Sequence, residues 1–237
     1  MKRRRLGQHY LVDEGVVRRV LELADIRPTE KVLEIGTGRG ALTRELAGRG
    51  ASLVGYEVDA ENVEATKKVV RRTGADIRLG NAFDERPDFD VLVSSLPYSE
   101  SGTFVEWLSG IKFGRAVVVL QDDFVRKLLA PPGDRDYRGV SSLAQIAFDV
   151  KVEGRVPRAS FSPPPRVNSV IASFVPKRQV PAGEIANIVR LFSLRRRQVS
   201  SALGELGMKG KGTFGRRRVF ELAPEEVHEL CRLRRAK

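Results

Sequence analysis

The chain has 237 residues, 41% of them apolar and 30% charged, which favours one large domain or one domain with a small appendage. No apolar run approaches the roughly 20 residues that span a bilayer, and no apolar stretch of a secretory signal follows the basic opening. The single cysteine, Cys231, excludes an internal disulfide and a multi-cysteine zinc site. We therefore expect a cytoplasmic protein without a membrane segment and without a bound metal.

The net charge of +12 is concentrated at the two ends of the chain. Residues 177–237 hold 15 Lys and Arg against 6 Asp and Glu, whereas residues 6–176 hold 23 basic and 24 acidic residues. Lys2, Arg3, Arg4 and Arg5 supply the excess at the other end. Solubility or adaptation to heat would also explain basic residues, but their localisation favours a nucleic acid, whose phosphates the basic ends would hold.

Short β-rich runs alternate with helical patterns over the first two thirds of the chain. The strand candidates are residues 32–35, 52–57, 76–79, 91–94 and 116–120, and the helical segments between them are residues 41–49, 60–72 and 101–110. This alternation predicts an α/β fold with a doubly wound sheet of parallel strands and right-handed crossovers. Such sheets bind ligands at the carboxyl ends of their strands.

The second half of the chain predicts a different organisation. Helices are predicted at residues 122–129, 140–148, 184–203 and 224–233, and an antiparallel pair of strands at residues 150–156 and 169–175. No strand pattern remains beyond residue 180, where the basic excess also begins. We therefore expect a first domain over residues 1–180 and a small basic helical domain over residues 181–237.

A glycine-rich segment follows the first predicted strand and precedes a helix. Gly36, Gly38 and Gly40 would let the backbone approach a ligand closely, and Glu57 ends the next strand, where a carboxylate could bind ribose hydroxyls. The spacing fits a nicotinamide dinucleotide, a nucleoside-type methyl donor or a purely structural turn. Glu34, within the strand, favours the methyl donor because a carboxylate suits a cationic sulfonium ligand.

Two further strand ends carry polar and aromatic residues. Asn81 follows the third strand and could hydrogen-bond an adenine amino group, although a Gly-Asn turn is an equally good interpretation. Ser95, Leu96, Pro97 and Tyr98 follow the fourth strand. Ser95 Oγ and the Leu96 carbonyl could accept hydrogen bonds from the amine of a flat base, and Tyr98 could stack on that base. An ordinary proline loop with a packed tyrosine is the alternative.

A proline-stiffened segment, residues 161–167, begins with Phe161. Such a loop loses little entropy on ordering, and it could present Phe161 to the other face of an extruded base. A proline-rich connector between domains is the alternative. Together with the glycine segment, these strand ends favour methyl transfer from S-adenosylmethionine to the exocyclic amine of a base.

These motifs, in this order, resemble the KsgA-type rRNA adenine N6-dimethyltransferases, which share a fold with the Erm resistance methyltransferases. The segments that carry the resemblance are residues 7–13 (GQHYLVD), 32–43 (VLEIGTGRGALT), 56–59 (YEVD), 95–98 (SLPY), 121–127 (QDDFVRK), 161–169 (FSPPPRVNS) and 191–198 (LFSLRRRQ). The resemblance covers nearly the whole chain and favours the methyl donor over the nicotinamide. It implies a Rossmann-like class I methyltransferase sheet with a small helical domain, acting on adenine N6 in small-subunit rRNA during ribosome biogenesis.

The resemblance also implies roles for individual residues. The donor-binding positions are Gln8, His9, Leu11, Gly36, Gly38, Glu57, Asn81 and Ser95; the catalytic positions are Ser95, Leu96, Pro97, Tyr98 and Phe161; and the RNA-binding positions are Arg3, Arg4, Arg5, Arg195, Arg196 and Arg197. We expect a monomer whose partner is the immature small ribosomal subunit.

Three positions depart from the family pattern. Ser95 stands where the catalytic Asn is usual, Asn81 where the adenine-binding Asp is usual, and His9 where Asn is common in the opening motif. The shorter Ser95 could slow methylation or weaken its second step. These departures motivate an alternative, a catalytically weak or silent rRNA-binding assembly factor on the same fold.

Overall fold

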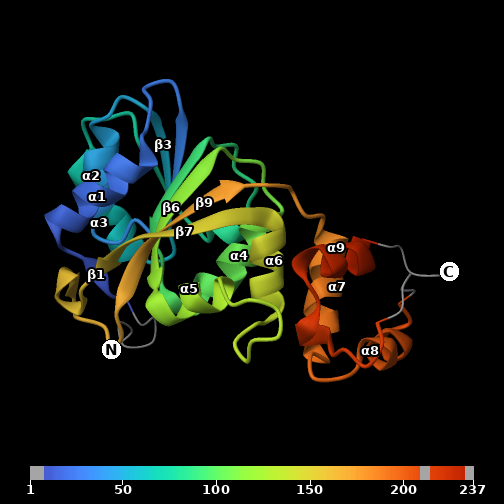
Figure 1. Cartoon of the computed structure of the whole chain (residues 1–237). Coiled ribbons are helices and arrows are strands. Elements are labelled where there is room, and N and C mark those ends of the chain that lie inside the picture. Colours follow the sequence, from blue (N-terminus) through green and yellow to red (C-terminus); the bar gives the residue numbers. More distant parts are fainter. Residues whose placement is uncertain (1–7, 209–213, 233–237) are drawn as a thin grey trace. The chain divides into compact units, whose positions relative to one another are not determined.

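A computed structural model describes residues 8–208 and 214–232 of the chain (Figure 1). The chain divides into two compact units, each built from several segments. Of the described residues, the first contains 8–104, 111–125 and 151–176, and the second contains 105–110, 126–150, 177–208 and 214–232. The boundary expected at residue 180 assumes two domains that are each continuous in sequence. These discontinuous units do not test it, so it stays a prediction. Arg3, Arg4 and Arg5 lie outside the described residues.

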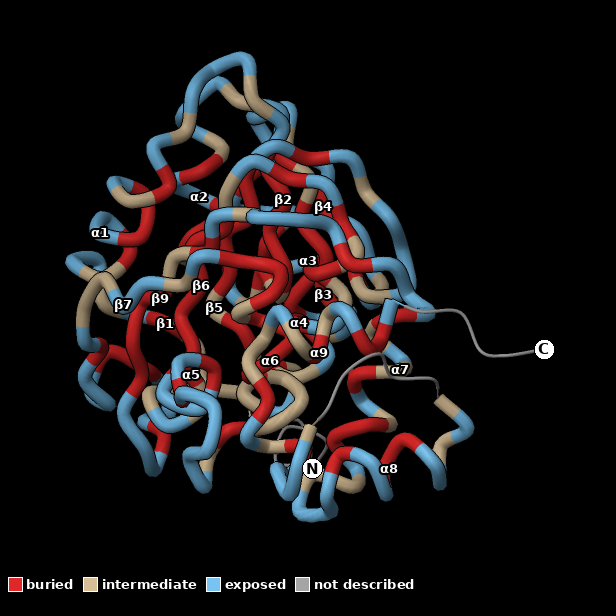
Figure 2. The backbone as a smooth tube through the Cα atoms, turned by 45° about the vertical axis from the view of Figure 1, so that its right-hand side comes forward, coloured by how far each residue is buried: buried red, intermediate tan, exposed pale blue. Residues whose placement is uncertain are grey.

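The first unit is built on a mostly parallel sheet, as the alternating pattern predicts. In spatial order its strands are β4 Asp76–Leu79, β3 Ser52–Glu57, β2 Lys31–Ile35, β5 Val91–Ser95, β6 Arg115–Gln121, β9 Ser169–Pro176 and β7 Phe148–Val156. The strands from β4 to β6 pair in parallel, and β9 pairs antiparallel to β6. Val91, Leu92 and Val93 are fully buried, as expected for a central parallel strand, and Figure 2 shows buried residues gathered in the strands of this sheet. The predicted α/β fold is confirmed.

Three helices of this unit connect or flank the strands. They are α1 Glu14–Ala24, α2 Ala41–Ala47 and α3 Ala60–Val70. α1 was not expected from the sequence pattern, although Asp13 caps it by accepting hydrogen bonds from the backbone N–H groups of Gly15 and Val16. The buried faces of α1 and α2 share one apolar cluster with β2 and β5, whereas α3 packs on β4.

The remaining helices are α4 Ser101–Ser109, α5 Asp122–Leu128, α6 Gly139–Ala147, α7 Ala182–Ser193, α8 Val199–Leu206 and α9 Pro224–Arg232. In the second unit α7 packs against both α6 and α9, burying Ile188 and Leu191 among the apolar residues of this unit. None of the helices within residues 8–208 and 214–232 is long and apolar enough to cross a membrane.

The single helix expected over residues 184–203 is wrong, because a turn at residues 194–198 separates α7 from α8. The backbone there bonds to a later segment instead of continuing the helix. The N–H of Val199 donates to the Arg217 carbonyl, and the N–H of Val219 donates to the Arg197 carbonyl, each at 3.0 Å. The three consecutive arginines therefore lie in a turn held by tertiary hydrogen bonds.

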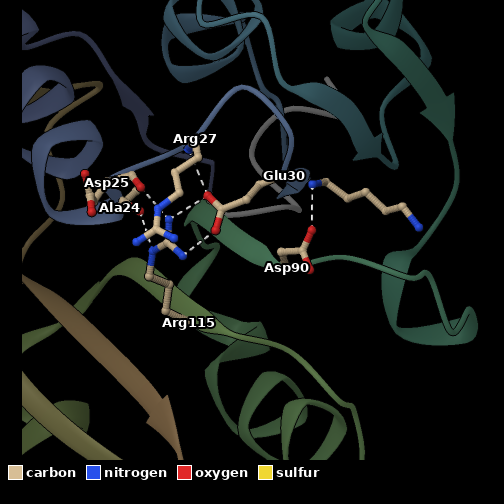
Figure 3. A network of polar contacts seen from close by, with 7 residues as sticks. Ala24, Asp25, Arg27, Glu30, Asp90 and Arg115 are labelled. Atoms are coloured by element: carbon tan, nitrogen blue, oxygen red, sulfur yellow. Dashed lines mark hydrogen bonds and ion pairs between the residues drawn. The ribbon is translucent and has the colours of Figure 1, made fainter.

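A polar network closes the amino ends of the central parallel strands (Figure 3). Arg115, the first residue of β6, donates to both carboxylate oxygens of Glu30 at 2.8 Å and, through Nε, to the Ala24 carbonyl at the end of α1 at 2.6 Å. This guanidinium holds the pKa of Glu30 near 2. Next to it, the N–H of Lys31 donates to the Asp90 carboxylate at 2.9 Å. These contacts tie α1, β2, β5 and β6 together at the edge opposite to the glycine segment.

Candidate functional site

A cavity of about 250 Å³ lies at the carboxyl ends of β2, β3, β4 and β5. The predicted site residues that line it are Gln8, His9, Leu11, Gly36, Gly38, Glu57, Asn81, Ser95, Leu96 and Pro97. The structure thus brings together residues from the opening segment and from the ends of four strands, as expected for the ligand edge of an open α/β sheet. Tyr98 and Phe161 are not among the lining residues.

The glycine segment is organised around the carboxylate of Glu57, which is 5% exposed. One oxygen accepts from the N–H of Gly38 at 2.8 Å, and the other accepts from the N–H groups of Val58 and Asp59 at 2.9 and 3.0 Å. A carboxylate offers about four acceptor positions, so roughly one remains for a ligand in the cavity. Glu57 therefore fixes the loop as well as lining the cavity.

Gly38 cannot be replaced without disturbing the opening segment. Its φ of +55° favours glycine, and a Cβ there would lie 3.2 Å from the ring of Tyr10. The Tyr10 hydroxyl donates to Gln8 Oε1 at 2.8 Å, and the guanidinium of Arg39 lies 4.5 Å above the centre of the Tyr10 ring. Tyr10 and Arg39 were not singled out in the sequence, because only the folded chain brings these segments together.

Glu34 is a buried cavity residue with unused bonding capacity. It is 1% exposed, and burial raises the pKa of its carboxyl to about 8, so it is protonated near neutral pH. Its Oε2 atom has no hydrogen-bond partner in the described part of the chain. A cationic ligand in the cavity would favour ionisation of Glu34 and would use this oxygen, so the position suits a ligand that carries positive charge.

Asn81 lies where the sequence places it, at the end of β4, but its side chain is partly engaged. Its Oδ1 atom accepts a hydrogen bond from the N–H of Phe83 at 3.1 Å and caps the short 3₁₀-helix Ala82–Asp84. The turn interpretation and the cavity interpretation are therefore compatible, because Asn81 caps a turn and lines the cavity at once.

The segment that follows β5 forms a second wall of the cavity. The Leu96 N–H donates to the Val119 carbonyl at 3.3 Å, so this residue is fixed to β6. Tyr98 has its hydroxyl 2.6 Å from Ser169 Oγ, and burial raises the pKa of its phenol. The tyrosine ring is therefore held beside the cavity from β9, while Ser95 and Pro97 line the cavity itself.

The opening segment is fastened to the proline segment. β1 Tyr10–Leu11 pairs antiparallel with β8 Phe161–Ser162, and the carboxylate of Asp13 accepts from Ser160 Oγ at 2.7 Å. This hydrogen bond is the main reason that the pKa of Asp13 is lowered. Two stretches about 150 residues apart in sequence thus form one small sheet, which we call the clasp, at the cavity.

Phe161 does not take the position expected of a base-stacking ring. Its side chain is 4% exposed and packs in the apolar cluster that includes Leu11, Val17 and Val20. The proline segment reaches the cavity through its contacts with β1 instead. The strand pairing turns Phe161 into the core beside Leu11, its register partner.

The three consecutive arginines of the second unit differ in their surroundings. Arg197 lies 3.4 Å from Glu205, which partly neutralises it. Burial lowers the pKa of Arg195, and the positive charges of Arg138 and Arg196 lower it further. Arg138, which precedes α6, was not expected from the sequence as part of this basic cluster.

Within residues 8–208 and 214–232, no group of three potential metal-binding side chains lies close enough to hold an ion. Cys231 is buried, and burial raises the pKa of its thiol to about 12. It therefore lies in the core as an unreactive thiol, and it offers neither a metal ligand nor a nucleophile.

Comparisons with known proteins agree over nearly the full length. The family described as "Ribosomal RNA adenine dimethylase" matches residues 1–227. A "Probable ribosomal RNA small subunit methyltransferase A" from Pyrococcus abyssi is 34% identical over 95% of this chain and 89% of its own length. A "Ribosomal RNA small subunit methyltransferase A" from Thermotoga neapolitana is 29% identical over 96% of this chain and 90% of its own.

Two solved structures have the same fold. A dimethyladenosine transferase from Plasmodium falciparum aligns with a TM-score of 0.79 and 23% identity over 94% of this chain and 96% of its own. The 23S rRNA methyltransferase ErmE aligns with a TM-score of 0.64 and 22% identity over 94% of this chain and 99% of its own. At these identities the likeness concerns the fold.

Proposed function

Because this chain belongs to the ribosomal RNA adenine dimethylase family, we propose that its cavity holds S-adenosylmethionine beside a target adenine of small-subunit rRNA. The activity is methylation of the adenine N6 amine. The observation that supports this assignment most is the gathering of the opening segment, the glycine segment, Glu57, Asn81 and Ser95 around one cavity. The assembly-factor alternative is not favoured, because the relatives are named as methyltransferases.

The residues that line the cavity fit the donor. Gly36 and Gly38 leave room where a side chain would intrude, and Glu57 offers its remaining acceptor position to the ribose. Asn81 would contact the adenine of the donor, and Gln8, His9 and Leu11 would cover its amino-acid end. The unpartnered oxygen of Glu34 suits a cationic ligand. When bound, the donor supplies a methyl group on a positively charged sulfur.

The second wall would hold the acceptor. The lone pair of an adenine amine is delocalised into the ring, so hydrogen bonds from its N–H groups to Ser95 Oγ and the Leu96 carbonyl would favour a pyramidal nitrogen. Pro97 fixes the backbone between these groups and Tyr98, and the ring of Tyr98 would stack on the base. The role of these residues is chiefly alignment and electrostatic stabilisation.

We assign binding of the rRNA backbone to the second unit and to the basic opening. Arg195, Arg196 and Arg197 would contact phosphates, as would Arg3, Arg4 and Arg5 near the other end of the chain. The predicted domains, residues 1–180 for catalysis and 181–237 for RNA binding, belong to the same proposal. The substrate would be an immature small ribosomal subunit in the cytoplasm, and the protein would act as a monomer.

Calorimetry with S-adenosylmethionine and transfer of tritiated methyl groups to immature small subunits test this function together. The proposal expects a saturable donor site and incorporation of label into small-subunit rRNA. Donor binding without transfer to any immature subunit would favour the assembly-factor alternative. A protein that binds no donor would contradict the assignment of the cavity.

A further inference from the structure

All three departures from the family pattern line the same cavity, and two of them, His9 and Ser95, replace an Asn. At both positions the resemblance implies an Asn, whose amide oxygen is a hydrogen-bond acceptor. Ser95 has a shorter side chain, and its hydroxyl reaches less far from β5. His9 has a larger side chain than Asn, with a ring nitrogen at its far end. Relative to Asn, the side chain at position 95 is therefore shorter, and the side chain at position 9 is longer.

The structure fixes which nitrogen of His9 can act as an acceptor. Nδ1 lies 2.7 Å from the carbonyl oxygen of Pro163. A carbonyl oxygen can only accept, so Nδ1 carries the hydrogen of this bond. In the neutral ring the other nitrogen, Nε2, is then a bare acceptor. Within the part of the chain that the structure describes, Nε2 has no hydrogen-bond partner.

The clasp also fixes where the ring of His9 lies. His9 directly precedes β1, which is paired with β8, and Pro163 directly follows β8. The ring centre of His9 lies 5.7 Å from that of Tyr98, with an angle of 32° between the planes. The imidazole therefore lies beside the segment that would hold the acceptor base, although its backbone belongs to the donor-binding segment.

We propose that His9 Nε2 is a catalytic acceptor for the target adenine amine, and that it supplies the hydrogen bond which Ser95 is too short to make alone. This inference rests on the proposed function. As the new N6–methyl carbon bond forms, the bond from that carbon to sulfur breaks and the sulfur keeps its electron pair. The proton released from N6 passes to Nε2 and then to water, which restores the neutral ring.

The charges around His9 are compatible with this role. Arg39, over the Tyr10 ring, and Glu100 also line the cavity, while Glu34 and Glu57 lie at the donor side. Pro163 offers only its carbonyl, so the proton on Nδ1 stays on the ring during the reaction. A pure donor contact by His9 is the competing interpretation, and it predicts a change of donor affinity instead of rate.

Four proteins separate these interpretations: the wild type, His9→Ala, Ser95→Asn and the double variant. Single-turnover methyl transfer to immature small subunits, at saturating donor and RNA, gives the rate, and calorimetry gives the donor affinity. We expect His9→Ala to lower the single-turnover rate about tenfold or more at saturating donor, a loss that any change of donor affinity cannot explain because the site is filled. Adding Ser95→Asn to His9→Ala should restore most of the rate, because the amide oxygen supplies the missing acceptor.

His9→Asn is the conservative variant and should keep the rate within about threefold of the wild type, since it retains an acceptor. An unchanged rate in His9→Ala, or a loss confined to donor affinity, would overturn the inference. The inference would also be overturned if the rate of the double variant were simply the product of the separate effects of His9→Ala and Ser95→Asn, because the two side chains would then act independently. A wild-type protein that binds donor but transfers no methyl group would overturn the proposed function and this inference together. Thermal unfolding of each variant identifies any loss that reflects folding.

Discussion

The two edges of the parallel sheet are built on opposite principles. At the amino edge Arg115 uses every nitrogen of its guanidinium in hydrogen bonds to Glu30, Ala24 and Asp25 (Figure 3). At the carboxyl edge the backbone takes left-handed conformations at Gly36 and Gly38, and a buried oxygen of Glu34 has no partner within the described residues.

This difference separates stability from function along one set of strands. Saturated hydrogen bonds lower the free energy of the folded chain whether or not a ligand is present. Unused bonding capacity and constrained backbone cost free energy until a ligand uses them, and such features gather at functional sites. Substitutions at the two edges should therefore have different consequences, which can be measured in the same protein.

The largest effect is expected at the glycine segment. Gly38→Arg should lower donor affinity by about 100-fold or more, which corresponds to at least about 2.7 kcal/mol, because its side chain would enter the cavity and displace Tyr10. Gly50→Arg is the matched control, since Gly50 also has a positive φ, +73°, but nothing lies within 4 Å of its added Cβ. Calorimetry with S-adenosylmethionine measures both. Equal donor affinities in Gly38→Arg and Gly50→Arg would contradict the assignment of this cavity as the donor site.

A smaller effect, on stability, is expected at the opposite edge. Arg115→Met should lower the free energy of unfolding by about 2 kcal/mol, because a largely buried Glu30 loses its partner, with donor affinity unchanged in the folded protein. Arg19→Met is the control: it breaks a pair with Glu22 in which both side chains are more than half exposed, and it should cost under about 1 kcal/mol.

The loss in Arg115→Met should depend on pH. The pKa of Glu30 is lowered to about 2 in the folded protein, below the value of roughly 4.3 expected in the unfolded chain. The stability that this pair contributes is thus present above about pH 4 and is lost as the pH falls towards 2. Denaturant unfolding between pH 7 and 3 measures it. If the loss of unfolding free energy in Arg115→Met increased as the pH fell, the assigned pair of Arg115 and Glu30 would be contradicted.

The clasp should affect both stability and donor binding, because β8 holds β1, which carries the cavity-lining residue Leu11. Ser160→Ala removes the hydrogen bond to Asp13 and should lower the free energy of unfolding by about 1 kcal/mol near neutral pH, with a measurable loss of donor affinity. The deficit should shrink below about pH 4, because the lowered pKa of Asp13 contributes stability only where the carboxyl is ionised. Ser162→Ala, two residues along and exposed, is the control and should change neither quantity.

The smallest effects are expected at residues 194–198, the turn of the second unit that carries the three consecutive arginines. Replacing Arg195 and Arg196 together by Ala should weaken RNA binding severalfold and reduce the salt slope of log K by up to about 0.9 per lost phosphate contact on a duplex. Arg197→Ala should do less, because Glu205 already lies beside Arg197. Filter binding over a range of salt concentrations measures the slopes. If Arg197→Ala changed the salt slope more than the double substitution of Arg195 and Arg196, Arg197 would be the main phosphate contact instead.

The sequence predicts these regions unequally, for a physical reason. Gly36, Gly38, Glu57 and Ser95 were found because each lies at or just after the end of a strand, and parallel strands bring their carboxyl ends to one edge. The pair of Glu30 and Arg115 is separated by 85 residues in sequence, and each residue alone is an ordinary charged residue at a strand end. Only the folded sheet makes them partners.

Two further expectations from the sequence differ from the structure for the same reason. The proline segment was expected to present Phe161 to the base, with an interdomain connector as the alternative, but strand pairing turns its ring into the core beside Leu11. The turn at residues 194–198 was missed because its helix pattern is broken only by tertiary hydrogen bonds to residues 217–220. Local patterns predict which residues end a strand, whereas side-chain direction depends on partners that are distant in sequence.

The most direct test is mass spectrometry of the nucleosides of small-subunit rRNA after incubation with donor and one of three proteins. We expect N6-methylated adenosine with the wild type and with Arg115→Met, at a temperature where both are folded, and none with Gly38→Arg. Absence of N6-methylated adenosine with the wild type, or its presence at wild-type levels with Gly38→Arg, would contradict the assignment of the carboxyl edge as the catalytic edge.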